Sequence, residues 1–525
     1  MWMPIRLVVS AVFVAAAVPD GCPEYEQYAR VSHGPSSSGR FKYPYQRPAE
    51  RCRSYPVPAV EETIKRVERL VSDPDLYRLF VNTWPNTVDT TVLWHGKALD
   101  NPDEELAFVI TGDIHAMWLR DSADQLQSYK PLLNSTSASA HSTSDNNIAS
   151  LFRGAINLQA RSIVRFPYCN AFRPPPESKP SASSHDQNHQ RRQLAKRDDS
   201  VQPPYDPGVV WECKYELDSL AAFLQLSWDY YDATRDAAFF GRFAWRAAVK
   251  AILQLAADMM QGTYTADGHV NKSPYTWLRD ANSATETVSN HGAGNPVAGN
   301  IGLVRSFFRP SDDSAIYQYL VPANMMFARY LDACVAIMEP LDGDTASRMR
   351  QMARGIRAAV EKYAVVKHPE FGDIFAYEVD GFGSHNLMDD ANIPSLLSIP
   401  HLGFLPSSDA TYQRTRAFVL SRSNPYYGSG PVLNSTGGPH LGPGMAWPMG
   451  VIIQIMTSDD DDEIVHGIRQ LMGSTSNLGL IHESVNTWDD TTWTRPWFAW
   501  ANGLFGQMIL DLLDRKPHLL ARSYQ

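Results

Sequence analysis

Residues 215–260 read YELDSLAAFLQLSWDYYDATRDAAFFGRFAWRAAVKAILQLAADMM. Their apolar residues recur every three to four positions, which predicts two helices, over Tyr215–Tyr231 and Asp236–Met260. Only a short polar loop separates these helices, so we expect them to pack against each other as a pair.

The same spacing of apolar residues recurs along most of the chain. Ile64, Val67, Leu70 and Val71 form one stripe, and short helical pieces are predicted near Ser122–Tyr129 and Ile393–Leu397. Longer helices are predicted over Asn146–Phe166, Asp312–Met338, Asp344–Val366, Ala410–Leu420, Met445–Met456, Asp459–Met472 and Pro496–Leu513. Strand-like segments are few and short, and Ala107–Ile110 is the best of them. We therefore predict an all-α toroid of paired helices, with its ligand site at the end where helix N-termini and loops converge.

Composition limits the classes of function. The 525 residues include 47 Lys and Arg against 57 Asp and Glu, a net charge of −10, which argues against nonspecific binding of nucleic acid. Thirteen Trp, 23 Tyr and 21 Phe suit a site in which sugar rings stack on aromatic side chains. An aromatic-rich core would give the same composition, so composition does not decide between the two.

The N-terminus has the features of a secretory signal peptide. Arg6 precedes the apolar run Leu7–Val18, and Ala15–Ala17 offers a cleavage site after residue 17. An uncleaved signal anchor is the alternative, and no later segment is apolar for long enough to span a bilayer. Three N-x-S/T sequons, at Asn134, Asn271 and Asn434, fit a secreted glycoprotein. We expect an extracellular protein, with the vacuole and the Golgi left open.

Cysteines and polar segments divide the chain into parts. Residues 18–56 read as an extended Pro/Ser-rich leader, and residues 57–525 as one domain with a disordered insertion at about 171–207. Cys169 and Cys213 flank this insertion, so we pair them; Cys22 would then pair with Cys52, and Cys334 would be a buried free thiol. No C-x-x-C or H-E-x-x-H motif is present, so the sequence offers no zinc site.

The first motif that could carry chemistry is TGDIHAMWLRDSADQLQSY, residues 111–129. A sugar pocket needs carboxylates that accept hydroxyl contacts, an arginine and an aromatic wall, and this motif supplies all three. The candidate residues are Asp113, His115, Trp118, Arg120, Asp121 and Asp124. A buried Arg–Asp pair at a helix start is the alternative interpretation.

Two further motifs contain acidic groups. In FFRPSDDSAIYQYLVPANMMFA, residues 307–328, Ser311 is predicted to cap a helix, and the adjacent Asp312 and Asp313 could divide a proton-donor role and a hydroxyl-binding role. In GLIHESVNTWDDTTWTRPWFAWANGLF, residues 479–505, Glu483 is a candidate general base among tryptophans that could equally belong to the core.

These motifs, with HGAGNPVAGN (residues 291–300) and DDANIPSLLSIPHLGF (residues 389–404), resemble in sequence and order glycoside hydrolase family 125, the exo-α-1,6-mannosidases. The resemblance runs from about Val60 to Leu513. It implies an (α/α)6 barrel, no catalytic metal or other cofactor, and an inverting mechanism on terminal α-1,6-linked mannose. It places the general acid at Asp312, with Asp313 as the alternative, and the general base at Glu483.

Chemistry agrees with that implied pair, because glycoside hydrolysis needs one protonated and one ionised carboxyl across the scissile bond. The charge of Asp313 would favour a proton on Asp312, and a helix start there would oppose it. We expect the substrate-binding residues to be Asp113, His115, Trp118, Arg120, Asp121, Arg309, Asp313 and Asp390.

We expect the chain to act as a monomer on a mannose-containing oligosaccharide or N-glycan, with no membrane span after cleavage of the signal peptide. A glycosidase of other sugar or linkage specificity, and a mannan-binding toroid without activity, are the competing hypotheses.

Overall fold

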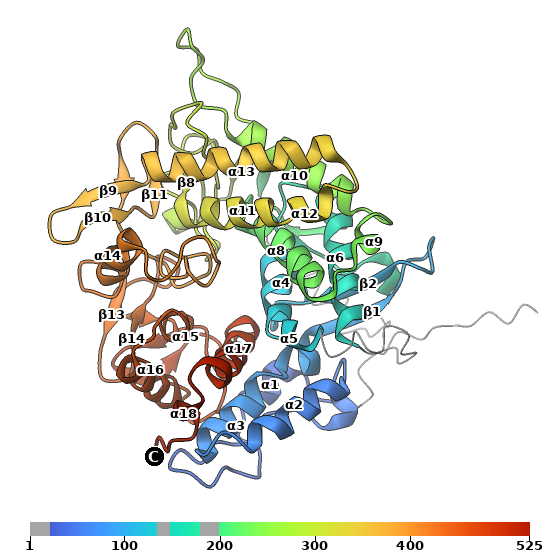
Figure 1. Ribbon diagram of the computed structural model, residues 1–525, viewed down its shortest axis with the longest axis vertical. Helices are drawn as coiled ribbons and strands as arrows, with labels where there is room; N and C mark the ends of the chain where they lie inside the picture. The colour runs from blue at the N-terminus through green and yellow to red at the C-terminus, as the bar shows by residue number, and fades with distance from the viewer. Residues whose placement is uncertain (1–20, 134–146, 179–198) are drawn as a thin grey trace, which may run out of the picture.

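The computed structural model describes residues 21–133, 147–178 and 199–525. The predicted signal peptide, Asn134 and most of the predicted insertion lie outside the described residues. Figure 1 shows the helices arranged around a ring, in which outer and inner elements alternate along the chain. The outer helices are α3 (Pro74–Thr83), α6 (Ile148–Arg165), α10 (Trp245–Met259), α13 (Gly343–Tyr363), α14 (Ala410–Val419) and α16 (Asp461–Gly473).

The inner helices are α4 (Leu119–Gln127), α8 (Leu217–Thr234), α11 (Val321–Ala333), α15 (Pro448–Met456) and α17 (Ala499–Arg515). Between α13 and α14, turns over residues 389–404 take the inner place. Helix α4 packs on α8 and α8 on α11, while α17 packs on α15, α3 and α4 and so closes the ring. The chain thus forms the predicted (α/α)6 barrel.

Burial follows these positions. The inner helix α8 is buried without a break from Leu217 to Ser227, because its neighbours cover it on several sides. The outer helix α13 buries mainly a stripe spaced by three or four residues, which includes Ala346, Met349, Ala353, Ile356 and Val360. Helix-rich packing of this kind explains why apolar periodicity predicted most of the helices.

The remaining α-helices are α2 (Pro58–Glu68) and five helices of four residues each: α1 (Tyr25–Tyr28), α5 (Lys130–Leu133), α9 (Ala237–Phe240), α12 (Val335–Met338) and α18 (Pro517–Leu520). None of the described helices is long and apolar enough to cross a membrane.

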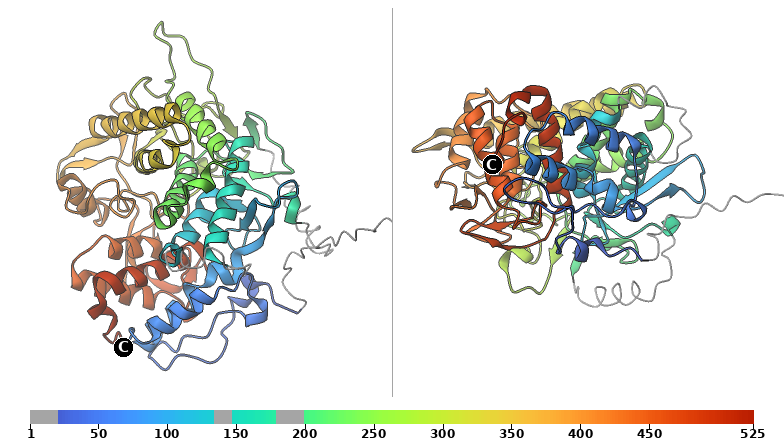
Figure 2. Two further views of the ribbon diagram at one scale, coloured as in Figure 1. Left: turned by 45° about the vertical axis from the view of Figure 1, so that its right-hand side comes forward. Right: turned by 90° about the horizontal axis from the view of Figure 1, so that it is seen from below.

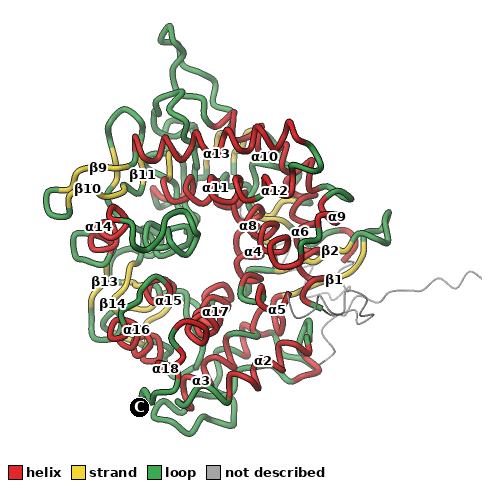
Figure 3. Tube along the Cα trace, viewed as in Figure 1, coloured by secondary structure: helices red, strands yellow, loops and turns green. Residues whose placement is uncertain are grey.

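The strands form small antiparallel sheets. One joins β3 (Met117–Trp118), β4 (Ala171–Phe172) and β6 (Val210–Glu212), and another joins β15 (Met445–Ala446), β16 (Val485–Asn486) and β17 (Asp489–Trp493). A third joins β8 (Tyr319–Leu320), β11 (Glu378–Val379) and β12 (His385–Asn386), and β5 (Ser200–Gln202) pairs with β7 (Thr276–Leu278). Three hairpins lie at the periphery in Figure 3: β1 (Val92–Lys97) with β2 (Glu105–Val109), β9 (Val365–His368) with β10 (Gly372–Phe375), and β13 (Tyr427–Ser429) with β14 (Asn434–Thr436).

Two predicted helices are wrong. The helix expected from Asp312 begins instead at Val321, because Ser311 does not cap it: the Ser311 hydroxyl donates to Asp390, and residues 311–318 form a loop. The piece expected near Ile393–Leu397 consists of turns. Pro394 has no N–H, and the N–H groups of Leu396 and Leu397 donate to the Asp389 carboxylate rather than to helical carbonyls.

The predicted disulfides are confirmed. Cys22 is bonded to Cys52 and Cys169 to Cys213, while Cys334 is a buried free thiol. The described ends of the predicted insertion pack on the barrel rather than standing free: Arg279 beside β7 pairs with Asp199 at the start of β5, at 2.7 Å.

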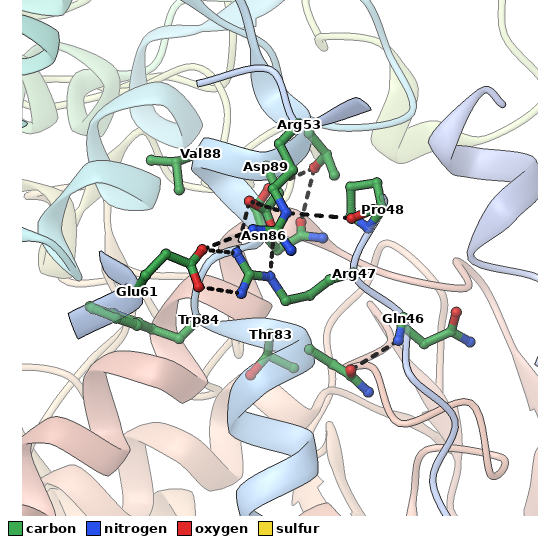
Figure 4. A network of polar contacts seen from close by, with 12 residues as sticks. Gln46, Arg47, Pro48, Arg53, Glu61, Thr83, Trp84, Asn86, Val88 and Asp89 are labelled. Atoms are coloured by element: carbon green, nitrogen blue, oxygen red, sulfur yellow. Dashed lines mark hydrogen bonds and ion pairs between the residues drawn. The ribbon is translucent and has the colours of Figure 1, made fainter. Parts of the chain in front are cut away.

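The described leader residues are also packed on the domain. Figure 4 shows Arg47 from the leader reaching Asp89 and Glu61. The Arg47 Nε donates to Asp89 at 2.7 Å, and its Nη2 donates to Glu61 at 2.6 Å. Both Arg47 and Asp89 are buried, so each charge depends on the other for compensation.

Replacing Arg47 with methionine should therefore lower the free energy of unfolding by about 3–5 kcal/mol, since it leaves the Asp89 carboxylate buried beside only the more distant Arg53. Urea unfolding followed by tryptophan fluorescence would measure the change. Arg30→Met is the matched control, because the Arg30–Glu26 pair is exposed and should contribute about 0–1 kcal/mol. Equal losses in the two variants would contradict a special role for the buried pair.

Candidate active site

One cavity lies at the end of the ring where the inner helices begin. Figure 2, right, shows the ring from the side, with long loops gathered at one end. The cavity, of about 100 Å³, takes its walls from the segments that precede or open α4, α11, α15 and α17. Its lining includes Trp118, Arg120, Asp121, Asp312, Asn392, His440, Trp447, Glu483, Arg495, Phe498 and Trp500. Helix N-termini carry partial positive charge, which favours carboxylates here.

Asp312 projects into this cavity from the loop before α11. Its backbone is left-handed, with φ of 68°, a conformation that non-glycine residues adopt rarely and that is often found at functional sites. The Lys214 Nζ donates to the Asp312 carbonyl at 2.8 Å and so holds this turn. The Asp312 side chain is 31% exposed, which leaves it open to a ligand.

Arg120 connects the acidic groups on this side of the cavity. Its Nη1 lies 2.8 Å from both Glu216 Oε2 and Asp218 Oδ2, and its Nη2 lies 3.7 Å from Asp121 and 3.9 Å from Asp312. Burial raises the pKa of Asp121 to about 6, although Arg120 opposes that shift. The Arg120 guanidinium thus lies close to four carboxyl groups. Its single positive charge cannot compensate four negative charges, so ionising all four would be energetically costly.

The surplus of acidic groups favours a proton on Glu216 over one on Asp312. Burial raises the pKa of Glu216 well above its ordinary range, and the charge of Asp312 adds to the shift. Burial also acts to raise the pKa of Asp312, but Lys214 and Arg120 outweigh it and hold that pKa below its ordinary range. The two carboxyls therefore behave as a pair that holds one proton.

Glu483 lines the same cavity, and Thr494 and Arg495 fix the position of its carboxylate. The Thr494 hydroxyl donates to Glu483 Oε2 at 2.7 Å, and the Arg495 Nε lies 3.1 Å from Oε1. Arg495 also pairs with Asp113, which therefore orients Arg495 and does not line the cavity. These contacts suit an ionised carboxylate with a fixed direction.

His440 adds positive charge to the cavity wall. Its Nδ1 lies 3.4 Å from Asp313 Oδ2. Burial acts to lower the pKa of His440, but the close contact with Asp313 and the charges of Asp313, Asp312 and Glu483 raise it to about 9. The imidazole is therefore protonated at neutral pH.

The structure brings only some of the predicted site residues together. Trp118, Arg120, Asp121, Asp312 and Glu483 line the cavity. The remaining predicted residues lie outside its lining. Asp313 contacts His440, Arg309 is buried against Glu378 at 2.6 Å, Asp390 accepts from Ser311 at 2.8 Å, Asp124 is buried within α4, and His115 is exposed.

Several residues of this site were not singled out from the sequence: Lys214, Glu216, His440, Trp447, Arg495 and Phe498. Lys214 and Glu216 stand immediately before helix α8, as Arg120 and Asp121 stand at the start of α4. Charged residues at the start of each predicted inner helix were therefore a usable signal. His440 lies in a Gly/Pro-rich loop and carries no such signal.

The described residues contain no group of three His, Cys, Asp or Glu side chains placed to hold a metal ion. Among family models, residues 73–510 match that of the metal-independent α-mannosidases, GH125. The chain is 45% identical over 505 residues to the "Meiotically up-regulated gene 157 protein" of Schizosaccharomyces pombe, with 96% of this chain and 94% of that protein covered.

A solved structure of a metal-independent α-mannosidase from Streptococcus pneumoniae is also similar. It is 31% identical with a TM-score of 0.75, and the match covers 88% of this chain and 99% of that one. That protein is described as a non-productive substrate complex with α-1,6-mannobiose.

Proposed function

This chain belongs to the metal-independent α-mannosidases of glycoside hydrolase family 125, and on that premise we propose that it releases terminal α-1,6-linked mannose from an oligosaccharide with inversion. The observation that carries the proposal is that Asp312 and Glu483 line one cavity in different electrostatic surroundings. Asp312 belongs to a pair that holds a proton, and Glu483 is paired with an arginine. The α-1,6-mannobiose bound to the Streptococcus relative supports the choice of linkage.

In the proposed reaction, Glu483 accepts a proton from water as the water oxygen attacks the anomeric carbon. Asp312 gives its proton to the glycosidic oxygen as the bond from that oxygen to the anomeric carbon breaks. Because Asp312 is ionised in the free enzyme, we infer that the proton reaches it from Glu216. Trp118, Trp447, Phe498 and Trp500 supply the apolar faces against which a sugar ring can stack.

Hydrolysis of a panel of mannobioses would test the linkage. We expect the α-1,6 isomer to be cleaved at least about tenfold faster than the α-1,2 and α-1,3 isomers, with the rate unchanged by EDTA. Faster cleavage of another isomer would change the proposed linkage specificity but would still support glycosidase activity. Tight binding of all three without cleavage would favour a mannan-binding toroid instead.

The pair of Glu216 and Asp312 also predicts a pH dependence. A general acid must keep its proton, so kcat/KM should fall at high pH as the pair loses the one proton that it shares. In Glu216→Gln the side chain at residue 216 has no proton to pass to Asp312, and Arg120 and Lys214 still hold the pKa of Asp312 low. The alkaline limb of the kcat/KM profile should therefore move to lower pH.

Glu339→Gln is the matched control, because Glu339 is half exposed and pairs with Arg350 on the outside of the ring. A variant at Glu216 that lost activity equally at every pH would show a structural role only.

We further propose that the chain is made in the secretory route. Its two disulfides support this, because such bonds form and persist in oxidising compartments. Detection of the full chain with Met1 intact and without N-glycans in the cytosol would contradict the proposal.

A further inference from the structure

A second cavity, of about 290 Å³, lies apart from the active site. Loop residues 261–273, which follow α10, and loop residues 290–296 form most of its wall, and Arg305 completes it. It shares no lining residue with the first cavity. Tyr264 and Val270, which face each other in an isolated antiparallel bridge, stand at 50% and 70% exposure on its wall.

Arg305 is the unusual residue of this cavity. It is only 4% exposed, and among the described residues its guanidinium forms no ion pair or hydrogen bond, while its Nε is buried without an acceptor. The buried arginines Arg47, Arg120 and Arg309 each pair with a carboxylate. Burying a charge without a partner is costly, so this arrangement calls for an anionic ligand.

The groups around Arg305 do not supply the negative charge that a carboxylate would. Its Cζ lies 5.5 Å from the centre of the Phe307 ring, and the ionisable groups that influence it are Tyr319, Tyr215 and Tyr168. Burial lowers the pKa of Arg305, yet an arginine remains protonated at physiological pH. The cavity therefore keeps a positive charge at its inner end.

Other hydrogen-bonding groups near Arg305 also lack partners in the described part of the chain. The Tyr215 hydroxyl and the Gln318 side-chain amide are buried without any hydrogen bond. Gln318 lies directly behind Gly294 of the cavity wall, so closely that a Cβ at residue 294 would overlap the Gln318 amide. Lys272, an exposed residue of the wall, adds a second cation. Arg305 and Lys272 therefore give the cavity wall two cations, while Tyr215 and Gln318 lie outside its lining.

We propose that this cavity is a binding site for an oxyanion, a phosphate or carboxylate group, held by Arg305 with Lys272 at the rim. The planar guanidinium fork matches two oxygens of either group. The seven residues from Arg305 to Asp312 span at most about 25 Å, so an acidic substituent on a larger oligosaccharide could lie here while its terminal sugar lies at the catalytic acid. That last step rests on the proposed glycosidase function.

Isothermal titration calorimetry on the full chain would test the site with inorganic phosphate, mannose 6-phosphate and mannose. The titration should be run on protein with N-glycans and on protein without them, because the sequon residue Asn271 forms part of the cavity wall; binding seen only without N-glycans would overturn the site in the secreted protein. We expect saturable binding of phosphate and mannose 6-phosphate that weakens with rising salt. Arg305→Gln should weaken it at least tenfold and Lys272→Gln about threefold, with Arg246→Gln, at an exposed position, as the control.

The two phosphate ligands distinguish the sources of the anion. At least tenfold tighter binding of mannose 6-phosphate than of phosphate, with both weakened in Lys272→Gln, would indicate a sugar-borne group; equal affinities would indicate a free anion. Lys272→Gln keeps the test valid if Arg305→Gln fails to fold, since Lys272 is exposed. Absence of saturable binding, or equal binding by wild type and Lys272→Gln, would overturn the proposal. Binding is measured without turnover, so either result leaves the glycosidase function to its own tests.

Discussion

Replacing Glu483 with glutamine should lower kcat for α-1,6-mannobiose by about 10²–10⁴-fold, with KM changed little. Glutamine keeps the shape of the side chain and can still contact Thr494, but it cannot accept a proton from water. The substrate should therefore bind normally, but no group removes a proton from the attacking water. Steady-state kinetics with the purified variant would measure both constants.

Asp490→Asn is the matched control for this change. Asp490 belongs to the same motif as Glu483 but does not line the cavity, so its variant should keep near-normal kcat. Retention of more than about a tenth of wild-type kcat by Glu483→Gln would rule out Glu483 as the general base.

The second large effect is expected for Asp312→Asn, and it depends on the leaving group. Asparagine cannot donate a proton to the glycosidic oxygen, so kcat/KM for α-1,6-mannobiose should fall by about 10²–10⁴-fold. An aryl mannoside such as 2,4-dinitrophenyl α-mannoside releases a stable phenolate without protonation. Its kcat/KM should fall by less than about tenfold, and comparing the two substrates would isolate the acid.

Asp313→Asn tests the choice within the adjacent pair. Asp313 is buried, lies outside the cavity lining and contacts His440, so its loss should affect both substrates to a similar extent. If Asp313→Asn showed the dependence on the leaving group and Asp312→Asn did not, the acid would be Asp313.

Apolar periodicity predicted well those helices that are buried by packing against neighbouring helices of the ring. Helix α8 was predicted at Tyr215–Tyr231 and lies at Leu217–Thr234, because an inner helix must be apolar on most of its surface. The start of α11 was missed because Ser311 binds Asp390, 79 residues later in the chain. A local capping pattern carries no information about such a distant partner.

Only part of the candidate site could be predicted from the sequence. Asp312, Glu483 and Arg120 stood out because they occur in motifs with several polar and aromatic residues together. Glu216, His440 and Arg495 come from three separate segments, and only closure of the ring places them around the same group of carboxyls. Asp113 and Asp390 stay predicted sugar contacts; in the structure Asp113 pairs with Arg495, and Asp390 accepts a hydrogen bond from Ser311.

The stereochemistry of cleavage tests whether Asp312 and Glu483 act as acid and base on opposite sides of the scissile bond. If they do, their carboxyls should stand roughly 6.5–9.5 Å apart, with room for water. Proton NMR of α-1,6-mannobiose during hydrolysis would identify the anomer released before mutarotation. We expect β-mannose as the first product, and α-mannose appearing first would contradict inversion.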